Sequence, residues 1–162
     1  MSISSILSIS HLVETNSLPP KICKLRLLRI QSIAKTNRRG FGKIKRCVKN
    51  GKYTISLNEN RQENIDFINE YNLTSKKQRQ ILLEITTDDF CHSLKNKKQG
   101  FEHETLYVFT PEVLLKDADG NTVSLYVYTK FNIIETRRGN FTVIISFHKL
   151  NRPIQFAFKT QR

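Results

Sequence analysis

The sequence contains no tryptophan, one methionine and three cysteines among its 162 residues. The cysteines, Cys23, Cys47 and Cys91, are odd in number, far apart and never part of a C-x-x-C pair. This pattern argues against a disulfide framework and against a zinc knuckle. It is typical of a protein whose thiols stay reduced, and we therefore expect a cytoplasmic protein.

Long apolar runs are also missing. No stretch approaches the ~18 consecutive apolar residues that a membrane-spanning helix needs, so we expect no membrane association. The first twenty residues are rich in serine and have no basic residue before their apolar positions, which makes a poor signal peptide. A short helix over Ile6 to Val13 is compatible with them, and Pro19 and Pro20 would end it.

Acidic residues are scarce: 14 Asp and Glu stand against 27 Lys and Arg, for a formal net charge of +13. Between Lys21 and Lys52 there are twelve basic residues and no acidic one, with Gly40 and Gly42 dividing the segment. Uncompensated charge of this kind favours a polyanionic partner, either nucleic acid, an anionic membrane surface or an acidic protein. We interpret the segment as a basic arm that contacts phosphates; a solvated basic helix that only confers solubility is the alternative.

Two amphipathic helices are predicted after a short extended run at YTISL. The first lies within NRQENIDFINEYNL and the second within SKKQRQILLEI, for which Thr74 or Ser75 is a candidate N-cap. Thr86 to Asp89 suits the start of a further helix, because carboxylates there meet the positive end of the helix dipole.

The second half of the chain is patterned as strands. LYVF predicts one strand, VLL its continuation after Pro111, ADGN a tight turn, and IQFAF at residues 154–158 a final strand. The segments SLYVYTKFNII and FTVIISFHKL, joined by ETRRGN, predict an antiparallel hairpin. The fold class is therefore α+β: a small, mostly antiparallel sheet with helices packed on one face. We expect a tail and basic extension over residues 1–40 and the folded domain over residues 41–162.

Alternation along the hairpin sorts its side chains onto two faces. With a turn centred near Arg138, Tyr128 lies opposite His148 and Lys130 opposite Ser146. On the second arm Val143, Ile145 and Phe147 are expected to share the core face, and Ile144, Ser146 and His148 the other one. A phenol, an ammonium and an imidazole then stand side by side. A solvated outer face with an incidental histidine is the alternative.

These residue types suit RNA cleavage without a metal or cofactor. Histidines can take the proton of the 2′-hydroxyl and return one to the departing 5′-oxygen, while cations and tyrosine hold the phosphate. The candidates in one expected neighbourhood are His92, His103, His148, Tyr128, Lys130, Lys95 and Arg138.

Other chemistries have weaker support. Cys91 and His92 are adjacent rather than spaced as zinc ligands usually are, and no second close pair exists. Cys91 is either a nucleophile or a buried thiol without a chemical role. Glu102 or Glu104 either orients an imidazole or belongs to a polar loop edge. No nucleophile elbow and no phosphate-binding glycine loop occurs.

The order of two helices, TTDDFCHSL, LYVF, VYTKF and IISFHK resembles the MqsR-type toxins of bacterial toxin–antitoxin pairs, which have a RelE-like fold. Their pattern has Asp-Phe-aromatic-Lys-Ser after the second helix, Tyr-x-Lys in the next-to-last core strand, and a terminal Val-Ser-Phe-Lys strand. The similarity covers roughly Ile44 to Lys149. It implies a ribosome-independent mRNA endoribonuclease that a cognate antitoxin protein holds inactive.

Carried over by position, the family's catalytic lysine falls on His92, its tyrosine on Tyr128 and its strand-end lysine on His148. The family's catalytic glutamine has no counterpart, since Leu106 occupies the nearest position. We therefore hypothesise His92 as base or phosphate ligand, Tyr128 orienting the phosphate and His148 as general acid. Lys130 and Lys95, with Arg138 and His103, would supply positive charge. A nucleic-acid-binding regulator without catalysis and a basic protein that docks on an acidic partner are the alternatives.

Overall fold

The computed structural model describes residues 20–158, and their side chains from residue 35 onward. The short helix expected over Ile6 to Val13 therefore lies outside the described residues. Residues 1–33 and residues 34–162 form two separate units. The sheet and the candidate site belong to the second unit. No helix in the described part of the chain is long and apolar enough to cross a membrane.

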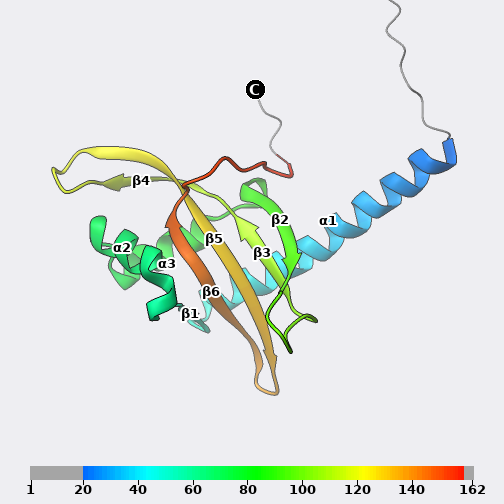
Figure 1. The fold of residues 1–162 in the computed structure, drawn as a ribbon, viewed down its shortest axis with the longest axis horizontal. Coiled ribbons are helices and arrows are strands. Elements are labelled where there is room, and N and C mark those ends of the chain that lie inside the picture. Colours follow the sequence, from blue (N-terminus) through cyan, green and yellow to red (C-terminus); the bar gives the residue numbers. More distant parts are fainter. Residues whose placement is uncertain (1–19, 159–162) are drawn as a thin grey trace, which may run out of the picture. The chain divides into compact units, whose positions relative to one another are not determined.

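Between residues 20 and 158 the helices and one short strand come first, and five consecutive strands follow (Figure 1). They are α1 (Pro20–Lys49), β1 (Tyr53–Ile55), the 3-10 turn η1 (Glu59–Arg61), α2 (Gln62–Glu70), α3 (Ser75–Glu84), the 3-10 turn η2 (Thr87–Asp89), β2 (Phe90–Lys95), β3 (Thr105–Phe109), β4 (Glu112–Lys116), β5 (Thr122–Thr136) and β6 (Gly139–Lys149). The predicted α+β class and the two helices after YTISL are confirmed.

The sheet has six strands in the order β1-β6-β5-β3-β2, with β4 paired to β5 off this path. Only β1 runs parallel to its neighbour, and the other pairings are antiparallel. The 15-residue strand β5 organises the sheet, because its first half pairs with β4 and its second half lies between β3 and β6. The predicted hairpin is the β5–β6 pair.

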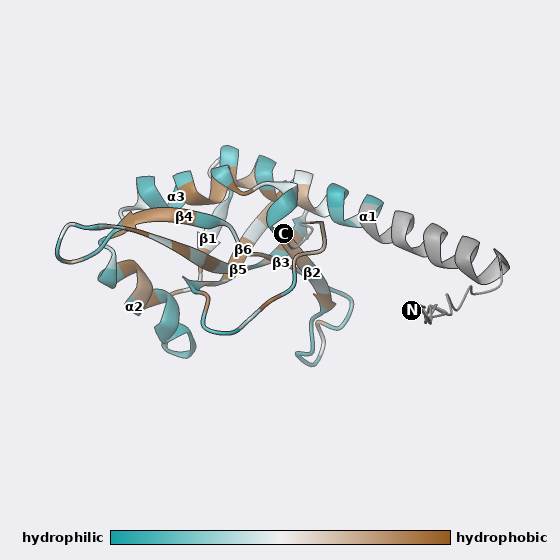
Figure 2. Ribbon diagram, turned by 90° about the horizontal axis from the view of Figure 1, so that it is seen from above, coloured by the Kyte–Doolittle hydropathy of each residue, from teal (hydrophilic) through white to brown (hydrophobic). Residues whose placement is uncertain are grey.

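One face of the sheet is the core. Helix residues Ile44, Val48, Phe67, Ile81 and Leu82 are buried in one cluster with the strand residues Phe109, Val127, Phe131, Ile144 and Phe147. Aromatic rings fill much of it, with Phe109 and Phe131 edge to face at 5.7 Å between ring centroids. Figure 2 shows α3 and the part of α1 after residue 34 on one side of the sheet. The opposite face, here called the outer face, carries the candidate site.

Helix α1 runs without interruption through Gly40 and Gly42, so these glycines do not divide the segment as expected. Gly40 has a packing role. A Cβ built there would lie 2.4 Å from Cζ of Tyr107 on β3, closer than any real contact. Glycine therefore lets the tyrosine ring pack directly against the helix backbone. Gly42 has nothing within 4 Å of a built Cβ.

A β-bulge in β6 corrects the predicted faces of that strand. Lys130 pairs with Ser146, but Phe131 pairs with Ile144, so Ile145 is an extra residue. Before the bulge the alternation is reversed: Ile144 is 0% exposed in the core, and Val143 lies opposite Asn132 on the outer face. After the bulge the predicted pairing holds.

Three other expectations were wrong. Thr86 to Asp89 forms one capped 3-10 turn rather than a helix, and β2 begins at once because Phe90 is buried against Phe109. VLL belongs to a separate strand, β4, which pairs with β5 and does not continue β3. Residues 154–158 do not form a strand, although Ala157 N–H donates to the Phe90 carbonyl at 2.9 Å.

Candidate functional site

The β5–β6 pairing brings Tyr128 and His148 together on the outer face, as predicted. Tyr128 lies opposite His148 and Lys130 opposite Ser146. The tyrosine and histidine rings are 5.3 Å apart between centroids and inclined by 32°. The two-residue turn at residues 137–138, which Gly139 closes with φ of +103°, pairs Thr136 with Gly139. The bulge at Ile145 then shifts the register by one residue, so that His148 rather than Phe147 lies opposite Tyr128.

His92 lies on the same face, two strands from β5. It pairs with Val108 of β3, and Val108 pairs with Lys130. Neighbouring strands are about 4.8 Å apart, so the Cα atoms of His92 and Lys130 are separated by roughly 10 Å. Val108 between them is 0% exposed. The three predicted catalytic side chains, His92, Tyr128 and His148, therefore share one face, with Lys130 among them.

Both ring nitrogens of His148 have an oxygen partner. Nε2 lies 3.2 Å from a carboxylate oxygen of Glu63, and Nδ1 lies 3.0 Å from the carbonyl oxygen of Lys149. The histidine side chain is 12% exposed and that of Glu63 66%. An imidazole that carries both protons donates to both oxygens, which is the arrangement that a proton donor needs.

Glu63 is held in place by its neighbour in α2, the buried Asn64. The Asn64 amide accepts from the backbone N–H of Phe147 at 2.8 Å and donates to the carbonyl of Ile145 at 3.2 Å. It also donates to the carbonyl of Ser56 at 2.8 Å. Asn64 thus occupies the edge of β6 where β1 has ended, and it fixes the first turn of α2 beside His148.

The cations of the site influence one another. Burial lowers the pKa of Lys130, and the positive charge of Arg61 adds to this effect. Partial burial away from water lowers the pKa of His92, and the positive charge of Lys130 lowers it further. Burial also raises the pKa of Tyr128, with a further contribution from Cys91. At neutral pH the outer face therefore holds a neutral His92 and a protonated Tyr128 hydroxyl.

Two hollows meet at His148 and Glu63, which line both of them. The first, about 340 Å³, is bounded by Tyr128 and by the chain after β6, residues 150–154. The second, about 220 Å³, is bounded by residues 59–64 and by Ser146. Each hollow contains one arginine, Arg152 in the first and Arg61 in the second.

The chain after β6 returns across the sheet toward β2, as the red segment in Figure 1 shows. Besides the bond from Ala157 to Phe90, the rings of Phe158 and Phe90 stack at 5.8 Å. The rings of Phe156 and Tyr126 lie 6.0 Å apart. These contacts hold the segment that forms one wall of the larger hollow.

Three predicted phosphate-binding residues are not brought to this cluster. Arg138 is at the tip of the β5–β6 hairpin, about 25 Å of strand from Lys130 at 3.3 Å per residue. Lys95 is at the far end of β2, where its ammonium reaches the carbonyl of His103 at 3.4 Å. His103 lies in the loop between β2 and β3 and lines a separate pocket.

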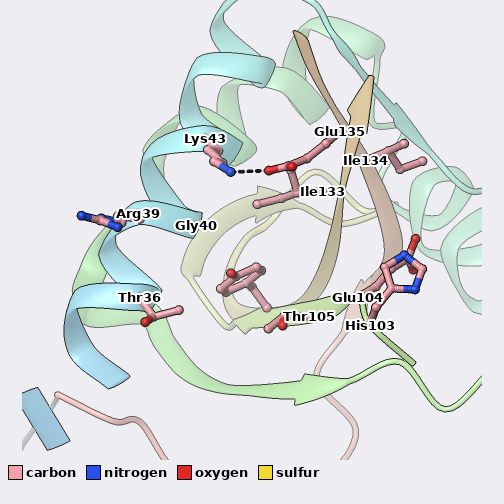
Figure 3. Close-up of a pocket in the computed structure, with 11 residues that line it drawn as sticks. Thr36, Arg39, Gly40, Lys43, His103, Glu104, Thr105, Ile133, Ile134 and Glu135 are labelled. Atoms are coloured by element: carbon pink, nitrogen blue, oxygen red, sulfur yellow. Dashed lines mark hydrogen bonds and ion pairs between the residues drawn. The ribbon is translucent and has the colours of Figure 1, made fainter. Parts of the chain in front are cut away.

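That separate pocket, about 730 Å³, lies between α1 and the ends of β3 and β5 (Figure 3). An ion pair between Lys43 and Glu135 crosses it. Glu104, named as an orienting carboxylate, accepts from the side-chain amides of Asn96 at 2.7 Å and Asn132 at 2.8 Å. These two bonds brace the loop before β3.

Sequence patterns did not identify Arg61, Glu63 or Arg152. The helix dipole favours a glutamate in the first turn of any helix, so nothing in the local sequence distinguished Glu63 as a partner of His148. Cys91 is buried, with its thiol 3.3 Å from the hydroxyl of Thr110. Within residues 35–158 no group of three or more His, Cys, Asp or Glu side chains is placed to hold a metal ion.

Comparisons of the chain with protein-family models, with curated proteins and with solved structures give no significant match. The chemistry is therefore interpreted from the side chains themselves. The outer face carries two imidazoles, a phenol and the Lys130 ammonium, with Arg61 and Arg152 in the adjoining hollows, and these are residue types that proton transfer and charge balance at a phosphate use.

Proposed function

We propose that this protein is a cytoplasmic, RelE-like toxin of a type II toxin–antitoxin system that cleaves mRNA without a metal ion. The observation that carries the proposal is the outer-face cluster: Tyr128 and His148 in ring contact, with Lys130 and His92 in the adjoining row. The net charge of +13 on the whole protein suits an RNA substrate, and an acidic antitoxin would be the protein partner.

The reaction is a transesterification. Neutral His92 takes the proton of the 2′-hydroxyl, and the 2′-oxygen bonds to phosphorus. The bond from phosphorus to the 5′-oxygen breaks, and His148 donates its proton to that oxygen. The products are a 2′,3′-cyclic phosphate and a 5′-hydroxyl, and solvent restores both histidines.

The remaining groups stabilise charge on the phosphate. Lys130 faces the non-bridging oxygens as negative charge builds on them, and the Tyr128 hydroxyl donates to one of them. Glu63 keeps the His148 ring oriented and balances its positive charge. These side chains come from rigid strands and a helix start, so their positions are set before substrate binds.

The test is cleavage of a single-stranded RNA in the presence of a chelator, with the ends mapped. We expect 5′-hydroxyl ends that can be phosphorylated directly, and no cut at a 2′-deoxy position. His148→Ala should lower the rate by about 10²- to 10⁴-fold, the usual contribution of a general acid. Tyr128→Phe should lower it less, and Tyr126→Phe on the same strand should leave it unchanged.

Melting curves would show whether each variant is folded. Cleavage by folded His148→Ala at the wild-type rate would refute this site. RNA binding without any cleavage by the wild type would favour the non-catalytic regulator instead.

A further inference from the structure

Two hollows adjoin one another at the His148–Glu63 pair. The strand β6 gives their order: the smaller hollow includes Ser146, before His148, and the larger includes Leu150, after it. A chain laid along this line would pass directly over the His148 ring. The proton donor of the proposed reaction thus stands at the junction of two binding spaces.

Each hollow supplies one guanidinium. Arg61 ends the 3-10 turn before α2, is half-buried, and acts electrostatically on Lys130. Arg152 follows β6 in the segment that Phe156, Ala157 and Phe158 anchor to Tyr126 and Phe90. Arginine binds phosphate through paired N–H groups, so an arginine in the hollow on each side of His148 suits a ligand that carries more than one phosphate.

We propose that the two hollows are subsites for successive nucleotides of single-stranded RNA, on either side of the cleaved phosphate, with Arg61 and Arg152 as phosphate ligands. This inference rests on the proposed function. It adds the substrate class, because hollows of about 340 and 220 Å³ accept nucleotides whose bases are turned out of a stack. A duplex keeps its bases inside and presents only its backbone.

The larger hollow favours the same class of substrate. It combines the Tyr128 and His148 rings with Pro153 and Ile154 opposite them. An unpaired base of any identity can stack on such rings. The wall opposite the rings exists only because the chain after β6 returns to β2.

Binding can be separated from cleavage with an uncleavable probe, a 2′-O-methyl RNA oligonucleotide whose binding is measured by fluorescence anisotropy. We expect the wild type to bind the single strand at least tenfold more tightly than the same strand in a duplex. Arg61→Gln and Arg152→Gln should each weaken single-strand binding about fivefold or more. Arg137→Gln, which removes the same charge from the exposed hairpin tip, is the matched control and should have little effect.

Arg61→Lys tests whether loss of binding reflects lost recognition or a disturbed start of α2. It keeps the charge and should bind more tightly than Arg61→Gln. Salt titration gives an independent measure: the slope of log affinity against log salt should fall by about 0.7 for each phosphate contact removed from a single strand.

Equal effects of Arg61→Gln, Arg152→Gln and Arg137→Gln, or equal affinity for single strand and duplex, would overturn the inference. The two proposals fail separately. If the arginines control binding but the wild type cuts no RNA, the subsites stand and the nuclease proposal is wrong. If His148→Ala abolishes cleavage while both arginine variants match Arg137→Gln, cleavage stands and the subsites are wrong.

Discussion

His148 and His92 differ in their surroundings, and this difference gives each of them a role. His148 has a carboxylate oxygen at one nitrogen and a carbonyl oxygen at the other. At His92, loss of water and the charge of Lys130 both lower the pKa of the ring. In the proposed reaction His148 gives a proton and His92 takes one, the two roles that bond cleavage at a phosphate requires.

The pH profile of cleavage follows from His92. A base must be neutral, so the rate should rise with pH through a pKa that lies below the ordinary 6.5 of histidine. Lys130 lowers this pKa by repelling the protonated ring. In Lys130→Gln that repulsion is gone, the pKa of His92 rises, and the ascending limb should move to higher pH.

The measurement is kcat/KM against pH for the wild type and Lys130→Gln. The variant will also be slower, because it lacks a charge that faces the phosphate, so the position of the limb is the informative quantity. Limbs at the same pH in both proteins would show that His92 is not the base.

At the scale of elements, the packing of α1 on β3 depends on one missing Cβ. Gly40 and Gly42 lie in the same helix, yet only at Gly40 would an added Cβ meet a side chain, the ring of Tyr107. Tyr107 is 7% exposed, so its ring has little room to move away. The two glycines therefore form a natural pair for comparison.

Gly40→Ala should destabilise the protein by about 1–3 kcal/mol, the usual cost of overpacking. Gly42→Ala should stabilise it by about 0.5–1 kcal/mol, because alanine is the better helix former and its methyl group meets nothing. Urea denaturation of both variants measures the difference. In a Tyr107→Leu background the cost of Gly40→Ala should shrink, and an unchanged cost would contradict this close approach.

The whole molecule is strongly basic, and charge by itself can impair a host cell through non-specific binding to nucleic acid. Catalytic toxicity and toxicity due to charge predict different behaviour for His148→Ala, whose basic surface is otherwise intact. Expression of the wild type in a bacterial host should arrest growth, and His148→Ala should not. If the protein is a toxin as proposed, co-expression of the protein encoded next to it should restore growth.

Growth curves after induction, with protein levels matched by blotting, measure this. Equal arrest by the wild type and His148→Ala would mean that the basic surface, and not cleavage, is responsible.

The β5–β6 hairpin could be predicted from local information alone. Alternation with a turn centred near Arg138 predicted Tyr128 opposite His148, and this pair is observed. The observed turn at residues 137–138 would by itself place Phe147 opposite Tyr128, and the bulge at Ile145 moves His148 into that position. Between the turn and the bulge the predicted faces of β6 were wrong, because one inserted residue reverses the alternation and no local pattern marked it. The helices within 61–85 were likewise readable from their apolar spacing.

The surroundings of His148 required the tertiary structure. Glu63 contacts His148, and Arg61 lines a hollow beside it, because Asn64 bonds to the edge of β6. Arg152 lines the other hollow because the chain after β6 returns to Phe90. These are contacts between residues far apart in the chain, and no local pattern encodes them. For the same reason Lys95, His103 and Arg138, which are of the residue types that the site uses, lie elsewhere: at the far end of β2, in the loop after it and at the tip of the β5–β6 hairpin.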